Sequence, residues 1–93
     1  MISIRVRYVA QLKQAAGVAS EEIELSAPWA ARDLLLLLAD RHGAPLRNLL
    51  LGEDGSPQPT ILVFVGDEQV VPSDRSLLKD GDVVTLLSPM AGG

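Results

Sequence analysis

The stretch "PWAARDLLLLLADRHG", residues 28–43, is the one segment of this 93-residue chain whose pattern predicts a long helix. Pro28 is expected in its first turn and Gly43 just past its end. Four apolar residues at helical spacing predict the buried stripe: Ala31, Leu34, Leu35 and Leu38. A single helix can cover only one face of a sheet. We expect the rest of the chain to form strands, and the face of their sheet that lies away from the helix is then left open.

Leu36 and Leu37 widen the apolar stripe beyond what one sheet face can cover. The following segment, "LRNLLL" at residues 46–51, predicts a short helical turn with Leu46, Leu49 and Leu50 on one side. We expect this short helical turn to cover Leu36 and Leu37, the residues that the sheet leaves uncovered.

Alternation of apolar and polar residues predicts the strands. It is clearest at residues 2–9, where Ile4, Val6 and Tyr8 share a face and Arg5 and Arg7 lie on the other. Further strands are expected at 21–26, 61–65, 68–71 and 83–88, with one helical turn at 10–17 that ends at Gly17. The segment 52–59 is a loop by composition.

The order strand, strand, helix, strand, short strand, strand indicates an α+β fold with a mixed sheet of about five strands. The first and last strands alternate most clearly, so we expect them to form a parallel central pair. With Ile61, Val63 and Val65 facing the core, the open face would carry Arg5, Arg7, Phe64, Thr85 and Leu87.

Composition excludes several classes of function. The chain has no cysteine and one histidine, so neither a thiolate metal site nor a cysteine nucleophile can form. His42 is expected to cap the end of the helix at the surface, and the acidic pair Glu21-Glu22 is expected to be solvated. No metal site, bound cofactor or enzyme activity is predicted.

Charge and hydropathy indicate the type of partner and the location of the protein. The formal net charge is −4, which disfavours nucleic-acid binding and suits a basic protein partner. The longest apolar run, residues 34–39, is far shorter than the ~20 residues that span a bilayer. No signal peptide precedes the first strand, so a cytoplasmic location is expected.

The C-terminal segment "LKDGDVVTLLSPMAGG", residues 78–93, resembles the end of the MoaD/ThiS family of ubiquitin-like sulfur carriers. It has an Asp-Gly-Asp turn, an apolar last strand, a proline and a terminal Gly-Gly. The segments "RYVAQLKQAAG", "ARDLLLLLADRHG" and "VFVGDEQV" are similar to molybdopterin synthase small subunits. The resemblance implies a β-grasp fold, with a domain at residues 1–88 and a flexible tail at 89–93.

Some residues depart from the molybdopterin branch. Ser88 and Met90 replace its usual Pro and Val, and Ala30 stands where a capping Thr is common. The loop from Ala44 to Pro59 is longer than in the thiamine-branch carriers. These departures leave the carrier chemistry intact and the pathway open.

The resemblance implies that Gly93 is the reactive residue. A partner activating enzyme would adenylate its carboxylate with ATP, and sulfur from a persulfide would then convert it to a thiocarboxylate. That sulfur would be donated on a second partner, such as the large subunit of molybdopterin synthase. Gly92 keeps the tail narrow enough to enter a partner's active site.

Docking energy must come from elsewhere, because ordering the tail costs roughly 1–2 kcal/mol per residue. The residues expected to bind partners are Phe64, Leu87, Pro89, Met90, Arg5 and Arg7.

Three functions remain open from the sequence. The first is a sulfur carrier in molybdenum-cofactor synthesis, acting as the small subunit of a two-protein synthase, with a carrier for thiamine, cysteine or tRNA thiolation as the alternative within the same class. The second is a protein modifier that forms isopeptide bonds with target lysines, and the third is an interaction domain with an inert tail.

Overall fold

The computed structural model describes residues 1–72 and 75–88. Its elements are, in chain order, β1 (Ile2–Val9), α1 (Gln11–Ala16), β2 (Ser20–Leu25), α2 (Ala31–His42), α3 (Leu46–Leu50), β3 (Leu62–Val65), β4 (Glu68–Val70) and β5 (Val83–Leu87). The five strands form one sheet in the order β2-β1-β5-β3-β4. β1 and β5 are the parallel pair, as the alternation predicts, and the other pairings are antiparallel.

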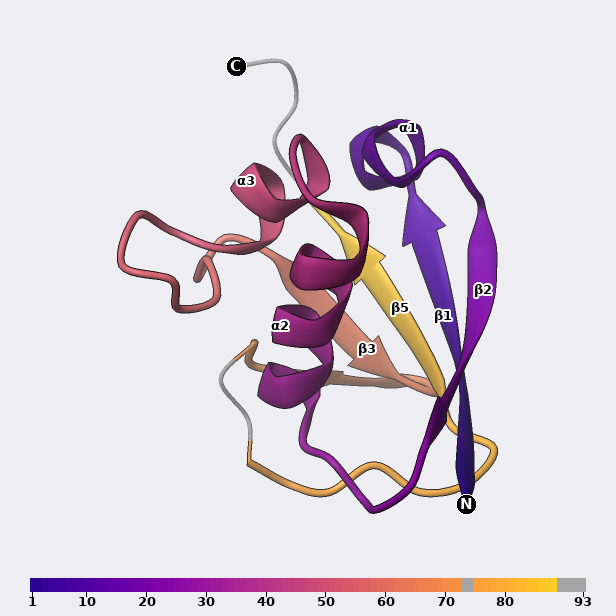
Figure 1. Ribbon diagram of the computed structural model, residues 1–93. Coiled ribbons are helices and arrows are strands. Elements are labelled where there is room, and N and C mark those ends of the chain that lie inside the picture. The colour runs from indigo at the N-terminus through magenta and orange to yellow at the C-terminus, as the bar shows by residue number, and fades with distance from the viewer. Residues whose placement is uncertain (73–74, 89–93) are drawn as a thin grey trace.

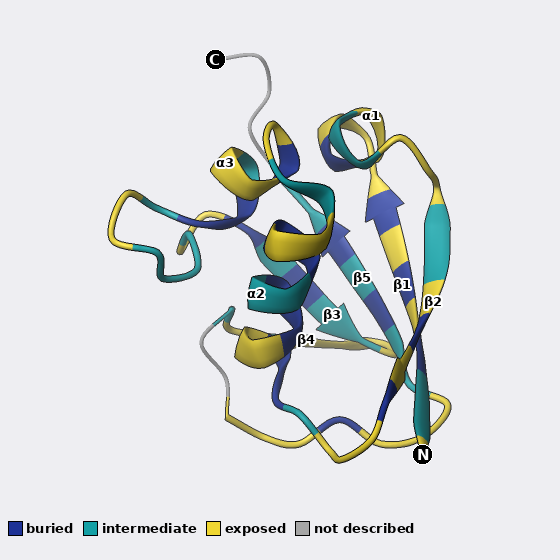
Figure 2. Cartoon of the chain, viewed as in Figure 1, coloured by how far each residue is buried: buried dark blue, intermediate teal, exposed yellow. Residues whose placement is uncertain are grey.

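α2 crosses one face of this sheet and α1 and α3 lie near one end of it (Figure 1). Buried residues gather where α2 and the sheet face each other (Figure 2). The core combines the predicted helical stripe with Ile61, just before β3, and with the inner pleats of the strands: Ile4, Val6, Ile23, Val63, Val84 and Leu86. This arrangement is the ubiquitin-like β-grasp, and the α+β prediction is confirmed.

α2 begins later than the sequence predicts, so Pro28 lies outside its first turn. Ala30 is extended, with φ −82° and ψ 165°, and the Asp33 carboxylate accepts its backbone N–H at 3.2 Å. The loop before β5 holds this stretch extended, because Leu78 N–H donates to the Trp29 carbonyl and Leu77 forms a β-bridge with Ala30. The C-terminal end is as predicted, since Gly43 has φ 70° and follows the last helical residue.

α3 forms where predicted, but it does not cover Leu36 and Leu37. Leu46 and Leu50 are fully buried and extend the core beside the end of α2. Leu36 and Leu37 instead stay half-buried, in a shallow groove on the outer side of α2. Within the described residues, no helix is long and apolar enough to cross a membrane.

Candidate functional site

The last strand of the sheet leads into the glycine-ended tail, so the position of β5 sets where that tail starts. Parallel pairing places the C-terminal ends of β1 and β5 at the same edge of the sheet, next to α1 and α3 (Figure 1). Ser88 is the last residue described before the tail. The predicted tail residues Pro89, Met90, Gly92 and Gly93 lie outside the described residues.

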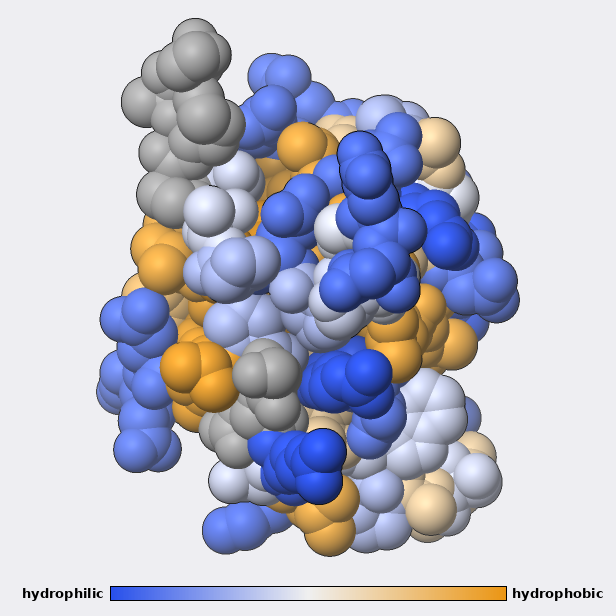
Figure 3. Space-filling model, turned by 90° about the vertical axis from the view of Figure 1, so that its left-hand side faces the viewer, coloured by the Kyte–Doolittle hydropathy of each residue, from blue (hydrophilic) through white to orange (hydrophobic). Residues whose placement is uncertain are grey.

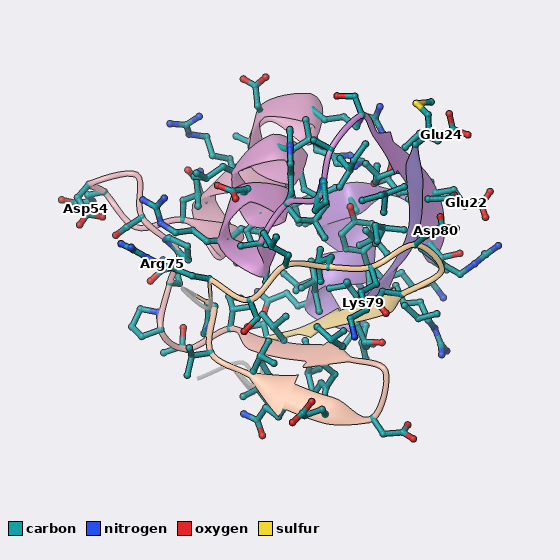
Figure 4. All side chains as sticks on the ribbon, turned by 90° about the horizontal axis from the view of Figure 1, so that it is seen from below. Glu22, Glu24, Asp54, Arg75, Lys79 and Asp80 are labelled. Carbon is teal, nitrogen blue, oxygen red and sulfur yellow. The ribbon has the colours of Figure 1, made fainter. Side chains whose placement is uncertain are left out.

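The Asp-Gly-Asp turn fixes the other end of β5. Asp80 accepts the Ser3 N–H at 2.7 Å, and Asp82 accepts the Lys79 N–H at 2.7 Å. Gly81 has φ 89°, a conformation in which a β-carbon would be strained. Lys79 and Asp80 lie on the loop that passes the start of β1, while Glu22 and Glu24 point outward from β2 (Figure 4). The turn therefore ties the starts of β1 and β5 together.

The open face of the sheet carries two cross-strand rows near the tail. Phe64 pairs with Thr85, which pairs with Arg7 in the next strand. One pleat nearer the tail, Leu62 pairs with Leu87 and Leu87 with Val9. The prediction that Phe64, Thr85, Leu87 and Arg7 share this face is confirmed; their role in binding stays a prediction.

We use the name docking face for Val9, Leu62, Phe64, Arg7 and Leu87. Val9 is 37 % exposed, and the other three apolar residues are half-buried rather than part of the core. Hydrophobic residues, in orange, are visible on the left-hand side of Figure 3, with hydrophilic residues between them. The docking face therefore presents a largely apolar surface beside Ser88, the last residue described before the tail.

Val9 and Leu62 were not among the predicted partner-binding residues. The alternation of residues 2–9 already placed Val9 on the same face as Arg5 and Arg7. What the sequence could not supply is the register, which sets both residues directly beside Leu87.

The two arginines of the open face differ in their surroundings. Arg5 forms an ion pair with Glu22 at 3.3 Å, with both side chains exposed. Arg7 has no ion pair within the described part of the chain, and it lies next to Thr85 on the docking face. Arg7 is thus the better candidate to meet a carboxylate of a partner.

A polar cluster on the opposite side of the sheet secures the end of β1. Tyr8 donates its hydroxyl hydrogen to Glu21 Oε2 at 2.6 Å, and His42 Nε2 lies 2.6 Å from the same oxygen. Arg41 adds a longer contact of 3.4 Å to Glu21 Oε1, and the rings of Tyr8 and His42 meet edge to face. The cluster joins β1, β2 and the end of α2.

This cluster corrects two predictions. His42 is not a surface cap, because its side chain is only 17 % exposed and contacts Glu21 and Tyr8. Glu21 is half-buried and hydrogen-bonded, and only its neighbour Glu22 is solvated as predicted. The spacing of residues 8, 21 and 42 in sequence gave no sign that they would meet.

The electrostatics of the cluster follow from burial and hydrogen bonding. Burial raises the pKa of Tyr8 far above its usual range, and donation to the Glu21 carboxylate raises it further. Burial alone would also raise the pKa of Glu21. The hydrogen bonds from Tyr8 and His42, and the charges of His42 and Arg41, outweigh that effect and lower this pKa.

Comparison with known proteins agrees with this geometry. The ThiS family model matches residues 6–93, which includes the second half of β1, the docking face and the terminal glycines. This chain belongs to the ThiS family. It is 32 % identical, over 92 residues, to the molybdopterin synthase sulfur carrier subunit of Chlamydomonas reinhardtii, covering 99 % of this chain and 100 % of the relative.

Solved structures show the same fold in other relatives. SAMP1 from Haloferax volcanii has a TM-score of 0.83 at 25 % identity, covering 98 % of this chain and 99 % of that one. A molybdopterin converting factor subunit 1 from Pyrococcus furiosus has a TM-score of 0.75 at 32 % identity, covering 97 % and 100 %. At the level of the family, this chain is a sulfur carrier of the MoaD/ThiS type, and the Chlamydomonas relative is itself named a sulfur carrier subunit.

Proposed function

We propose that this protein carries sulfur as a thiocarboxylate on Gly93 and donates it in the synthesis of molybdopterin. The observation that carries the proposal is the family match from residue 6 through Gly93, combined with the molybdopterin synthase relative that aligns over its whole length. The docking face supports it, because an apolar surface beside the start of the tail can supply the energy that ordering glycines consumes.

The chemistry needs two partners. An activating enzyme holds ATP, and the Gly93 carboxylate oxygen attacks the α-phosphorus to form an acyl adenylate and pyrophosphate. A persulfide sulfur then displaces AMP, and reduction of the resulting S–S bond by a thiol leaves the thiocarboxylate. Its ionised sulfur is a strong nucleophile toward the substrate held by a synthase subunit. The chain itself binds no cofactor in this scheme and acts as a co-substrate.

The test is the intact mass of the protein after incubation with ATP, a cognate activating enzyme and a persulfide source. The expected product has one oxygen replaced by sulfur. A variant without Gly93, or with one residue appended, should still bind the enzyme but release no pyrophosphate. One residue moves the carboxylate by up to about 3.3–3.6 Å, and misplacements of about 1 Å can cost a hundredfold in rate.

Gly92→Ala is the graded control, because it keeps the tail length and adds one methyl group. We expect slower adenylation rather than none. Turnover of the truncated or extended tail at the native rate would overturn the proposal and favour an interaction domain with an inert tail.

A second candidate is a protein modifier, favoured by the structural likeness to SAMP1, a small archaeal modifier protein. In that case activation would end in isopeptide bonds to lysines of other proteins. The same reaction, run with cell extract and analysed for target lysines that carry the C-terminal peptide of this chain (residues 80–93 after cleavage at Lys79) in an isopeptide bond, separates the two. Lys13 and Lys79 are the only lysines of the chain, so polymers would have few attachment points.

A further inference from the structure

The outer side of α2 carries an apolar groove that the proposed carrier function does not use. It is lined by Trp29, Asp33, Leu36, Leu37 and Asp40. The outer face of a surface helix is ordinarily polar, yet here Leu36 and Leu37 lie half-buried on it. Trp29, in the segment before α2, lines the same groove, and all three residues also pack against the core. Apolar patches rimmed by polar residues mark interaction sites, and tryptophan is enriched among residues that dominate binding energy.

The charges at the groove are of one sign. Asp33 and Asp40 are seven residues apart on α2, about 10 Å along the helix axis, with Leu36 and Leu37 between them. Within residues 1–72 and 75–88, neither aspartate forms an ion pair. Asp33 also accepts the Ala30 N–H, whereas Asp40 is exposed on the last turns of the helix. The nearest basic residue of α2 on that turn, Arg41, is turned toward Glu21.

We propose that this groove docks a basic amphipathic helix of a partner protein. The fitting helix has an apolar side chain to pack on Trp29, Leu36 and Leu37. It has lysine or arginine residues seven positions apart to meet Asp33 and Asp40, since that spacing repeats the spacing on α2. The chain's net charge of −4 favours encounter with such a partner.

A second copy of this chain fits the groove less well. Antiparallel pairing of two α2 helices about Leu36 and Leu37 would set Asp33 of one copy opposite Asp40 of the other. Like charges brought together in this way disfavour the pairing.

The position of the groove adds a consequence for partners. α2 lies on one side of the sheet (Figure 1). The docking-face residues alternate along β1, β3 and β5 with the core residues Tyr8, Val63 and Leu86, so they lie on the other side. A helix bound in the groove therefore leaves the docking face free, so two partners can bind at once.

The test uses the full chain and two synthetic helical peptides without tryptophan. Both have leucines in the middle turn, and they differ only in a pair of lysines or glutamates seven positions apart. Trp29 is the single tryptophan, so its fluorescence reports binding directly. We expect the lysine peptide to shift Trp29 emission to shorter wavelengths and to bind about ten-fold more tightly than the glutamate peptide.

Asp40→Lys should lower the affinity for the lysine peptide by about two- to five-fold or more, and it should raise the affinity for the glutamate peptide. Asp67→Lys is the matched control, because Asp67 is an exposed aspartate on the β3–β4 turn and gives the same change in net charge. Leu37→Ala should weaken both peptides, with thermal unfolding recorded to show that the fold is kept.

Three results would overturn the proposal: no binding of the lysine peptide, equal binding of both peptides, or equal effects of Asp40→Lys and Asp67→Lys. Sedimentation of the chain alone provides the last check. A dimer that Leu37→Ala dissociates would show that a second copy occupies the groove instead.

Discussion

At the scale of residues, the Tyr8 hydroxyl is the contact whose loss is easiest to measure. Its hydrogen bond to Glu21 joins β1 to β2 at the end of the sheet from which the tail departs. Tyr8→Phe keeps the ring in the core and removes this bond together with the longer contact of 3.4 Å to His42 Nε2. Because the acceptor is a partly buried carboxylate, we expect a loss of about 1–2 kcal/mol in the free energy of unfolding at neutral pH.

The stabilisation by the Tyr8–Glu21 hydrogen bond depends on pH, in a direction that the pKa of Glu21 determines. The folded-state pKa of Glu21 lies below its ordinary value of 4.5, so the stabilisation is fully present above that pH. The stabilisation is lost as the pH falls through the folded-state pKa of Glu21. The difference in the free energy of unfolding between Tyr8→Phe and the native chain should therefore shrink in that pH range. Urea unfolding from pH 7 down to pH 3 measures it. Glu22→Gln, at an exposed carboxylate, is the control; an equal loss there would contradict the role of the cluster.

At the scale of elements, the Asp-Gly-Asp turn is the device that joins the two central strands. Asp82 accepts the Lys79 N–H with its side chain, and its carbonyl accepts the Arg5 N–H at 3.0 Å. Asp82→Ala should cost about 1 kcal/mol and speed amide exchange at the start of β1, since a backbone donor loses its partner. Asp54→Ala serves as comparison, because Asp54 accepts hydrogen bonds from Ser56, a residue of its own loop. Equal losses in both variants would show that the turn has no special part in joining the strands.

At the scale of the whole molecule, the sheet separates a face that packs on α2 from a face that is open. Phe64→Ala and Leu87→Asp change only the open face, so we expect the fold to remain. Affinity for the activating enzyme should fall by about 2 kcal/mol or more for each, as for truncated residues at the centre of an interface. Calorimetric titration with the enzyme measures it.

Leu77→Asp is the matched control, since Leu77 is 60 % exposed but belongs to the loop before β5. The affinity of Leu77→Asp for the activating enzyme should equal that of the native chain. Unfolding of Phe64→Ala or Leu87→Asp would mean that these half-buried residues support the core after all.

Most of the fold could be predicted because its signals are local. The alternation of residues 2–9 placed Val6 in the core and Arg7 outside, and the apolar stripe placed Leu34 and Leu38 beneath α2. Gly43 and Gly81 could be recognised as ends and turns because positive φ angles select glycine. The resemblance of residues 78–93 then indicated the family.

What the sequence by itself determined is therefore the pattern of each element and the identity of the tail. Tertiary structure decided whatever depends on contacts between elements: the register that sets Val9 beside Leu87, the cluster of Tyr8, Glu21 and His42, and the late start of α2. The physical reason is that periodicity reports which side of an element is apolar. It does not report which residue of another element will lie opposite, because that follows from how all the elements pack together.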